Sequence, residues 1–262
     1  MGLELMWIVL VVCAIACAVG FYKYVYFLSI GYGFAIAAGA VATAVIFAGR
    51  MDWVAALQMV LFIAYGARLS GFLLVRELKS ASFNKAMKSV MKPEKPLPIF
   101  VSVSIWVCVA ILYTMQVSPM FYRLYNSTAD VTMPVIGAVI SVLGLLLESA
   151  ADKQKSEQKK KNPDMVATEG LYRIVRCPNY LGEIIFWTGV LVGAFTALQG
   201  AGQWIVAILA WVLIVFIMCN GAQRLEKRQM ARYGKDKAYS DYANKTPIIF
   251  PFVPLYHLNK QD

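Results

Sequence analysis

The sequence has little charge and a single histidine. Only 15% of its 262 residues are Asp, Glu, Lys or Arg, and the one histidine is His257, near the C-terminus. The five cysteines form no Cys-x-x-Cys pair and no cluster with histidine: Cys13, Cys17, Cys108, Cys177 and Cys219. Zinc sites are built from such groups, so the sequence gives no sign of one. We expect buried, structural thiols and no bound metal.

Apolar residues are abundant instead. They make up 60% of the chain, and the mean hydropathy is +0.61. Apolar runs near the ~20 residues that cross a bilayer recur along the sequence. The first has no basic segment before it and no clear small-residue cleavage site, so we expect it to be retained. We predict an all-α integral membrane protein with seven transmembrane helices, at about residues 4–22, 25–48, 53–77, 98–117, 131–151, 180–198 and 202–223.

Polar and helix-breaking residues separate these runs, for example Arg50-Met51-Asp52 and Ser118-Pro119. The formal net charge of +10 lies mostly in the connections and the tail. Most Lys and Arg fall on one side if the N-terminus is outside and the C-terminus cytoplasmic. This distribution explains the basic charge without nucleic acid, which we do not expect as a partner. We expect a multi-pass protein of a bacterial inner membrane, with Lys153–Lys161 as a solvated loop facing phospholipid.

The third apolar run contains polar residues at helical spacing. At ~100° per residue, Gln58, Tyr65, Phe72 and Arg76 fall on one narrow face, with Arg68 close beside them. Arg68 lies roughly two turns inside the predicted cytoplasmic end. Ionisable groups at such depth usually face a cavity or a binding site.

A second polar cluster begins at the end of the fifth run. Glu148 and Asp152 are four residues apart and so share a helix face, where they oppose the helix dipole. We expect them to pair with arginines or to accept hydrogen bonds from a ribose or an amide. Arg173 and Arg176 follow, and each offers bidentate donors for phosphate.

The sixth run starts at Pro178, with Asn179 in its first turn and Glu183 one turn later. The free N–H groups of a first helical turn attract anions. A further charged run after the seventh span faces the same side: Arg224, Glu226, Lys227 and Arg228. We therefore predict a cytoplasmic cavity that holds a large phosphorylated cofactor beside a lipid-facing pocket.

These motifs resemble the steroid 5-alpha-reductase family, and are most similar to its bacterial members of uncharacterised substrate. The stretch Gly170-Leu171-Tyr172-x-x-x-Arg176-x-Pro178-Asn179-Tyr180-x-Gly182-Glu183 carries the resemblance. Glu148-x-x-x-Asp152-x-Gln154-Lys155 and the tail Leu225-Glu226…Tyr239-x-x-Tyr242…Thr246-Pro247…Pro251 extend it.

The resemblance implies a seven-helix fold that binds NADPH and passes hydride to the C=C bond of a lipophilic enone, steroid-like or another lipid 3-oxo-4-ene. Residues 1–262 would form one membrane domain, with the four helices of 1–130 lining the substrate pocket and 131–262 binding the cofactor. Tyr65 would donate a hydrogen bond to the substrate carbonyl. The cofactor contacts implied are Arg68, Arg76, Glu148, Asp152, Lys159, Asn179 and Glu183, with Arg224, Glu226 and Arg228 near further ones.

Two positions depart from the family pattern. Steroid-reducing relatives pair the tyrosine with a glutamate of the second span, but residues 25–48 contain no carboxylate. The polar candidates to assist Tyr65 are Gln58 on the third span and Tyr26, Ser29 and Tyr32 on the second. Many relatives also have a histidine where Cys177 stands.

Two other functions fit part of the pattern. Isoprenylcysteine and phospholipid methyltransferases share an Arg-x-Pro-x-Tyr-x-Gly element and bind S-adenosylmethionine. A lipid-binding or transport protein could keep the fold without catalysis. The partners expected in every case are a lipophilic small molecule and membrane lipids, and the sequence leaves the oligomeric state open.

Overall fold

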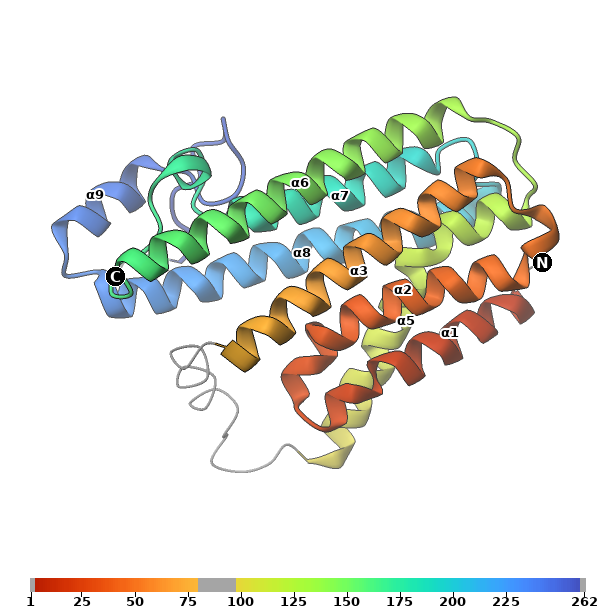
Figure 1. Ribbon diagram of the computed structural model, residues 1–262, viewed down its shortest axis with the longest axis horizontal. Helices are drawn as coiled ribbons and strands as arrows, with labels where there is room; N and C mark the ends of the chain where they lie inside the picture. Colours follow the sequence, from red (N-terminus) through yellow and green to blue (C-terminus); the bar gives the residue numbers. More distant parts are fainter. Residues whose placement is uncertain (1–2, 80–97, 260–262) are drawn as a thin grey trace. The chain divides into compact units, whose positions relative to one another are not determined.

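The computed structural model describes residues 3–79 and 98–259, and within them the chain forms helices and no strand (Figure 1). The lysines and prolines of residues 80–97 that supported the predicted topology lie outside this range. The α-helices are α1 (Leu3–Cys17), α2 (Ile30–Ile46), α3 (Trp53–Lys79), α5 (Ile99–Tyr125), α6 (Thr132–Lys161), α7 (Pro178–Gly193), α8 (Gly200–Tyr233) and α9 (Lys237–Lys245). Short 3-10 helices are η1 (Ala18–Phe21), η2 (Tyr24–Leu28), η3 (Ala48–Arg50) and η4 (Gly170–Arg173).

Five described helices are long and apolar enough to cross a membrane: Glu4–Phe21, Trp53–Val75, Ile99–Tyr125, Thr132–Lys161 and Gly200–Tyr233. The predicted all-α membrane class is therefore confirmed. The other two predicted spans correspond to shorter helices, α2 of 17 residues and α7 of 16 residues. Seven spans and their orientation stay a prediction.

The predicted break at Ser118-Pro119 is wrong, because α5 continues through Pro119 to Tyr125. Proline has no N–H, so the carbonyl of Met115 one turn earlier loses its usual helical donor. The hydroxyl of Ser118 donates to that carbonyl at 2.7 Å. A neighbouring side chain thus satisfies the group that the proline leaves unpaired, as happens in membrane helices.

The predicted loop at Lys153–Lys161 is also wrong, because these residues form the last turns of α6. The charged run from Arg224 likewise belongs to α8. At about 1.5 Å per residue, α6 with 30 residues and α8 with 34 residues are about 45 and 51 Å long. Both exceed a hydrocarbon core of about 30 Å, so their basic C-terminal turns extend beyond it.

The chain divides into two compact units. Unit 1 comprises residues 1–138 and 191–210, and unit 2 comprises 139–190 and 211–262. In unit 1, α2 packs on α1, α3 and α5, and α1 also packs on α5. Gly33 of α2 and Gly66 of α3 approach each other closely, since a Cβ on either residue would collide with the carbonyl oxygen of the other. Such contacts between small residues hold helices together where lipid removes the hydrophobic driving force.

A polar cluster joins three connections of unit 1: those before α3, between α5 and α6, and between α7 and α8. The buried Arg123 binds Asp52 at 2.8 Å, and Asn126 donates to Gln203 at 2.8 Å. Thr196 donates to Asp130 at 2.7 Å, and this bond holds the pKa of Asp130 below its usual range.

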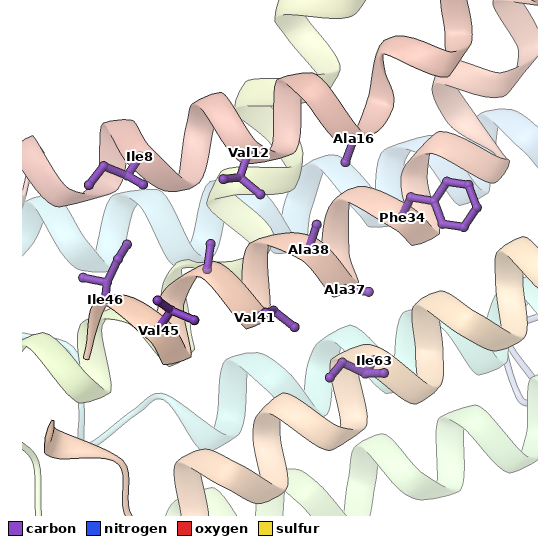
Figure 2. A pocket seen from close by; sticks show the side chains of 11 residues that line it. Ile8, Val12, Ala16, Phe34, Ala37, Ala38, Val41, Val45, Ile46 and Ile63 are labelled. Carbon is purple, nitrogen blue, oxygen red and sulfur yellow. The ribbon is translucent and has the colours of Figure 1, made fainter. Parts of the chain in front are cut away.

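Two apolar cavities lie in unit 1. One, of about 820 Å³, is lined by α1, α2 and Ile63 of α3, and Figure 2 shows that the side chains around it carry no polar group. The second, of about 620 Å³, lies between α1 and α5 and has Thr114 and Trp106 among its lining residues. Val45 in the first cavity is 71% exposed, so that cavity opens onto the lipid-facing surface.

In unit 2, α6 packs on α7 through a second glycine contact. A Cβ on Gly144 would collide with the backbone of Phe186 and Gly182, and one on Gly182 would collide with Glu148. Ser141 donates to the carbonyl of Phe186 at 3.0 Å. Trp211 of α8 donates to Thr188 of α7 at 2.9 Å, so α7 also packs on α8.

Candidate functional site

The proposed carbonyl donor, Tyr65, lies fully buried in unit 1 with 0% of its surface exposed. Its ring meets that of Tyr32 edge-on, with centroids 5.7 Å apart. Tyr32 in turn stacks on Tyr113 of α5 at 4.8 Å. The glycine contact explains the placement, because Tyr32 and Tyr65 each directly precede one of the two glycines, Gly33 and Gly66.

The other predicted residues of α3 have different environments. Gln58 is half-buried, and its Oε1 is buried without a hydrogen-bond partner among the described residues. Arg68 is half-buried, with its guanidinium 5.9 Å from the centre of the Phe72 ring. Arg76 lies in α3, but its side chain is outside the described part of the structure.

Two predicted cofactor contacts in unit 2 are buried carboxylates. Glu148 of α6 is 4% exposed and Glu183 of α7 is 6% exposed. Each is close to the glycine contact between these helices, since Glu148 lies against Gly182 and Glu183 follows Gly182 directly. Asp152 and Asn179 are half-buried. The α6–α7 contact thus brings Glu148 close to Gly182 and Glu183.

The loop before α7 is held by two glutamines that the sequence analysis did not assign. Gln154 accepts a hydrogen bond from the N–H of Leu171 at 2.9 Å, and Gln158 accepts from Thr168 at 2.9 Å and Glu169 at 3.1 Å. Gly170 has a φ of +63°, and a Cβ there would collide with Gln154. The signal in the sequence was the spacing of Gln154 and Gln158, which places both on one face of a helix that we expected to end before them.

Arg176 and Glu226 bind each other in a buried ion pair of 2.8 Å, with side chains 2% and 1% exposed. Arg176 also donates to the carbonyl of Tyr256. Glu226 accepts from His257 at 3.0 Å and from the backbone N–H groups of Leu258 at 2.8 Å and Asn259 at 3.1 Å. Both residues therefore fasten the C-terminal segment to α8 and to the loop before α7.

The tail also pairs with that loop through the backbone. The N–H groups of Arg176 and Cys177 donate to the carbonyls of Pro247 and Ile248 at 2.9 and 2.8 Å. Tyr242 of α9 donates to the carbonyl of Tyr172 at 2.7 Å. Burial raises the pKa of both Tyr172 and Tyr242, which keeps these hydroxyls neutral. Residues 242–248 of the C-terminal segment thus bind the loop of residues 172–177 before α7.

The remaining predicted basic contacts lie at the surface of unit 2. Arg173, Arg224 and Arg228 are exposed. Lys159 is half-buried; it donates to the carbonyl of Pro163 at 3.0 Å and lies 5.6 Å from the centre of the Tyr233 ring. Exposed guanidinium groups are available to bind phosphate, as they offer bidentate hydrogen-bond donors to it.

A family model described as "Protein of unknown function (DUF1295)" matches residues 12–246. The chain belongs to the DUF1295 family. This family member is 28% identical over 120 residues to the steroid 5-alpha-reductase DET2 of Gossypium hirsutum, and 25% identical over 122 residues to that of Arabidopsis thaliana. It is 26% identical over 98 residues to an uncharacterized protein of Schizosaccharomyces pombe. These matches confirm the resemblance to steroid 5-alpha-reductases that the motifs indicated.

The matched segments cover 45%, 45% and 37% of this DUF1295 member in the order given, and 41%, 41% and 31% of the relatives. The chain thus spans less than half the length of the curated relatives that it matches. No solved structure matches it at comparable significance.

Proposed function

We propose that this protein is an NADPH-dependent membrane reductase that transfers hydride to the C=C bond of a lipophilic enone. The observation that carries the proposal is the similarity to two steroid 5-alpha-reductases. The two apolar cavities of unit 1 support a lipophilic substrate, since ligand pockets for such molecules are lined mostly by apolar side chains.

The donor and acceptor groups of unit 2 suit NADPH. The ribose hydroxyls and carboxamide N–H groups of NADPH donate hydrogen bonds, and carboxylates accept them. Glu148 and Glu183 are buried carboxylates that can do so. Asn179 lies in the first turn of α7, where backbone N–H groups attract anions. Arg173, Arg224, Arg228 and Lys159 supply positive charge for phosphates.

NADPH would supply the hydride. The protein's part is to polarise the enone and to exclude water. Reduction places negative charge on the carbonyl oxygen, and the phenol of Tyr65 can donate a hydrogen bond to it. Full burial of Tyr65 strengthens that bond, because the local dielectric constant is low. Gln58, two turns along the same face of α3, would bind a second polar group through its amide.

The test is to purify the full chain in a mild detergent and identify the released small molecule by mass spectrometry. We expect NADP(H). S-adenosylmethionine or its demethylated product would instead establish a methyltransferase of the isoprenylcysteine or phospholipid type. Release of no nucleotide, together with unchanged properties of Tyr65→Phe in a lipid-binding assay, would indicate a non-catalytic lipid-binding protein.

Site variants sharpen the test. Asn179→Ala and Glu183→Ala are expected to lose bound nucleotide while the protein elutes as a folded species. The matched control is Asn220→Ala, a half-buried asparagine of α8 whose amide donates to the carbonyl of Phe216 in its own helix. Tyr65→Phe is expected to lower kcat by about 10²–10³, the cost of losing one donor to a developing oxyanion. Full retention of nucleotide by both unit 2 variants would remove the cofactor site proposed here.

A further inference from the structure

Tyr32 of α2 lies next to the proposed carbonyl donor, Tyr65. Its ring is 5% exposed and lies between two others, edge-on to Tyr65 with an interplanar angle of 69° and nearly parallel to Tyr113 with an angle of 16°. The three tyrosines come from α2, α3 and α5. A ring held on two sides has one rotamer available, because protein interiors are close-packed.

The backbone that carries Tyr32 is fixed at three points. Tyr113 donates its hydroxyl to the carbonyl of Phe27, in the 3-10 turn before α2. Ser70 of α3 donates to the carbonyl of Ile30 at 2.8 Å. Directly after Tyr32, Gly33 is pressed against Gly66. These anchors join the start of α2 to α3 and α5, so Tyr32 cannot shift relative to Tyr65 without breaking them.

Tyr113 has a different task. Its hydroxyl is committed to the Phe27 carbonyl, and its ring is 1% exposed. Tyr113 therefore packs its ring on Tyr32 and donates its hydroxyl to the backbone of the turn before α2. Tyr32 in turn packs on Tyr65.

We propose that Tyr32 is the positioning residue for Tyr65, holding the phenol that polarises the substrate carbonyl through an edge-on ring contact. The inference rests on the proposed function, because it assigns Tyr65 the donor's role. It makes a specific chemical claim: the aromatic ring of Tyr32 is required, and its hydroxyl is not. A catalytic group displaced by about 1 Å can cost about 10²-fold in rate, so a lost ring has a measurable effect.

The experiment uses the full chain in detergent, with NADPH and progesterone as the probe enone. Tyr32→Leu is expected to lower kcat by about 10- to 100-fold with a much smaller change in KM. Tyr32→Phe, which keeps the ring, is expected to restore kcat to near the wild-type value. Tyr122→Leu is the matched control, since it removes a buried tyrosine ring of α5 that contacts Phe121 instead.

A second readout does not depend on turnover. The chain is labelled with 3-fluorotyrosine, and the ¹⁹F resonance of Tyr65 is assigned by its absence in Tyr65→Phe. That resonance is expected to move in Tyr32→Leu by more than the lost ring current of Tyr32 accounts for, and to stay near its place in Tyr32→Phe and Tyr122→Leu. If Tyr32→Leu does not fold, Tyr32→Met replaces it, since methionine fills much of the volume without a ring.

The outcomes separate the two proposals. An unmoved Tyr65 resonance in Tyr32→Leu overturns the positioning role, whether or not progesterone is reduced. Equal loss of kcat in Tyr32→Phe and Tyr32→Leu also overturns it, because the hydroxyl would then be the required group. A third outcome is that Tyr65→Phe reduces progesterone at the wild-type rate while the Tyr65 resonance still moves in Tyr32→Leu. In that case the ring contact stands and the donor assignment of the proposed function fails.

Discussion

At the scale of single residues, Gln116 of α5 is a buried amide with an energetic cost. It is 2% exposed, and neither its Oε1 nor its Nε2 has a hydrogen-bond partner among the described residues. An unmet buried polar group costs about 1–3 kcal/mol. No sequence signal marked Gln116, because a lone glutamine in an apolar run resembles any tolerated polar residue.

We predict that Gln116→Met stabilises the protein by about 1 kcal/mol or more, since methionine has a similar shape and removes the unmet groups. The measurement is the midpoint of unfolding in detergent. Gln203→Met is the control, because the Gln203 amide accepts from Asn126 at 2.8 Å and from the Gln199 N–H at 2.7 Å and its loss should destabilise. A lower midpoint for Gln116→Met would mean that the Gln116 amide of the wild-type protein has a hydrogen-bond partner.

Cys177 gives a prediction about pH. Burial raises the pKa of its thiol to about 11, although Lys155 and Arg176 act in the opposite direction. The neutral thiol is therefore the form that the fold favours. Its contribution to the free energy of unfolding is present below the ordinary pKa of about 9 and is lost as the pH rises toward 11.

We expect alkylation of Cys177 by iodoacetamide to be slow in the native protein and to keep accelerating with pH beyond pH 10. In dodecyl sulfate the same site should react fast, with a rate that levels off at about pH 10, one unit above the ordinary pKa, as for a free thiol. Peptide mass spectrometry measures both rates. A plateau at about pH 10 in the native protein would contradict the burial of this thiol.

At the scale of helices, the two glycine contacts decide where the candidate site residues lie. Gly33 and Gly66 directly follow Tyr32 and Tyr65, and Gly182 directly precedes Glu183. In each unit a close backbone contact therefore lies beside residues of the proposed site. Glycine there lets two backbones meet, so the side chains beside it are placed by main chain rather than by flexible neighbours.

We predict that Gly66→Ala destabilises the protein by about 1–3 kcal/mol and lowers any reductase activity, because its Cβ would collide with the Gly33 carbonyl. Gly71→Ala in the same helix is the matched control. A Cβ at Gly71 meets nothing within 4 Å, so that change should be neutral or stabilise by about 0.5–1 kcal/mol. Thermal unfolding of both variants decides; equal midpoints would show that the α2–α3 contact is not tight.

Helix positions could be predicted from the sequence, but several helix ends could not. Apolar periodicity located α3, α6 and α8, whereas their continuation depends on contacts far along the chain. Lys153–Lys161 resembles a solvated loop until Gln154 and Gln158 are seen to bind residues 168–171. Pro119 resembles a helix end until Ser118 is seen to satisfy the carbonyl that the proline leaves free.

At the scale of the whole molecule, the candidate site was predictable where chemistry is local. The spacing of the motif from Arg176 to Glu183 places it at the start of a helix. The spacing of Glu148 and Asp152 places both on one helix face. The Arg176–Glu226 pair was not predicted, because it joins residues 50 positions apart. Arg176 and Glu226 were both expected to bind the cofactor, and in the structure they bind each other.

The membrane topology remains to be tested as a whole. Single cysteines at Gly49 and Gln199, in a background lacking exposed native cysteines, are expected to react with a membrane-impermeant maleimide added outside intact cells. A cysteine at Asp164 should react only after lysis. Labelling of the Gln199 position only from inside would mean that α7, with 16 residues, does not cross, and would overturn the seven-span prediction.

The contacts of Glu226 have a consequence for how the protein is made. Its carboxylate accepts hydrogen bonds from Leu258 and Asn259, and the latter is 33 residues downstream. At about 5–20 residues per second, the ribosome adds Asn259 about 2–7 s after Glu226. During that interval α8 must carry an incompletely satisfied acid, and the loop before α7 lacks its cover. Unit 2 therefore reaches its final form only after Leu258 and Asn259 have been made, and a chain truncated before Leu258 would stay in the earlier state.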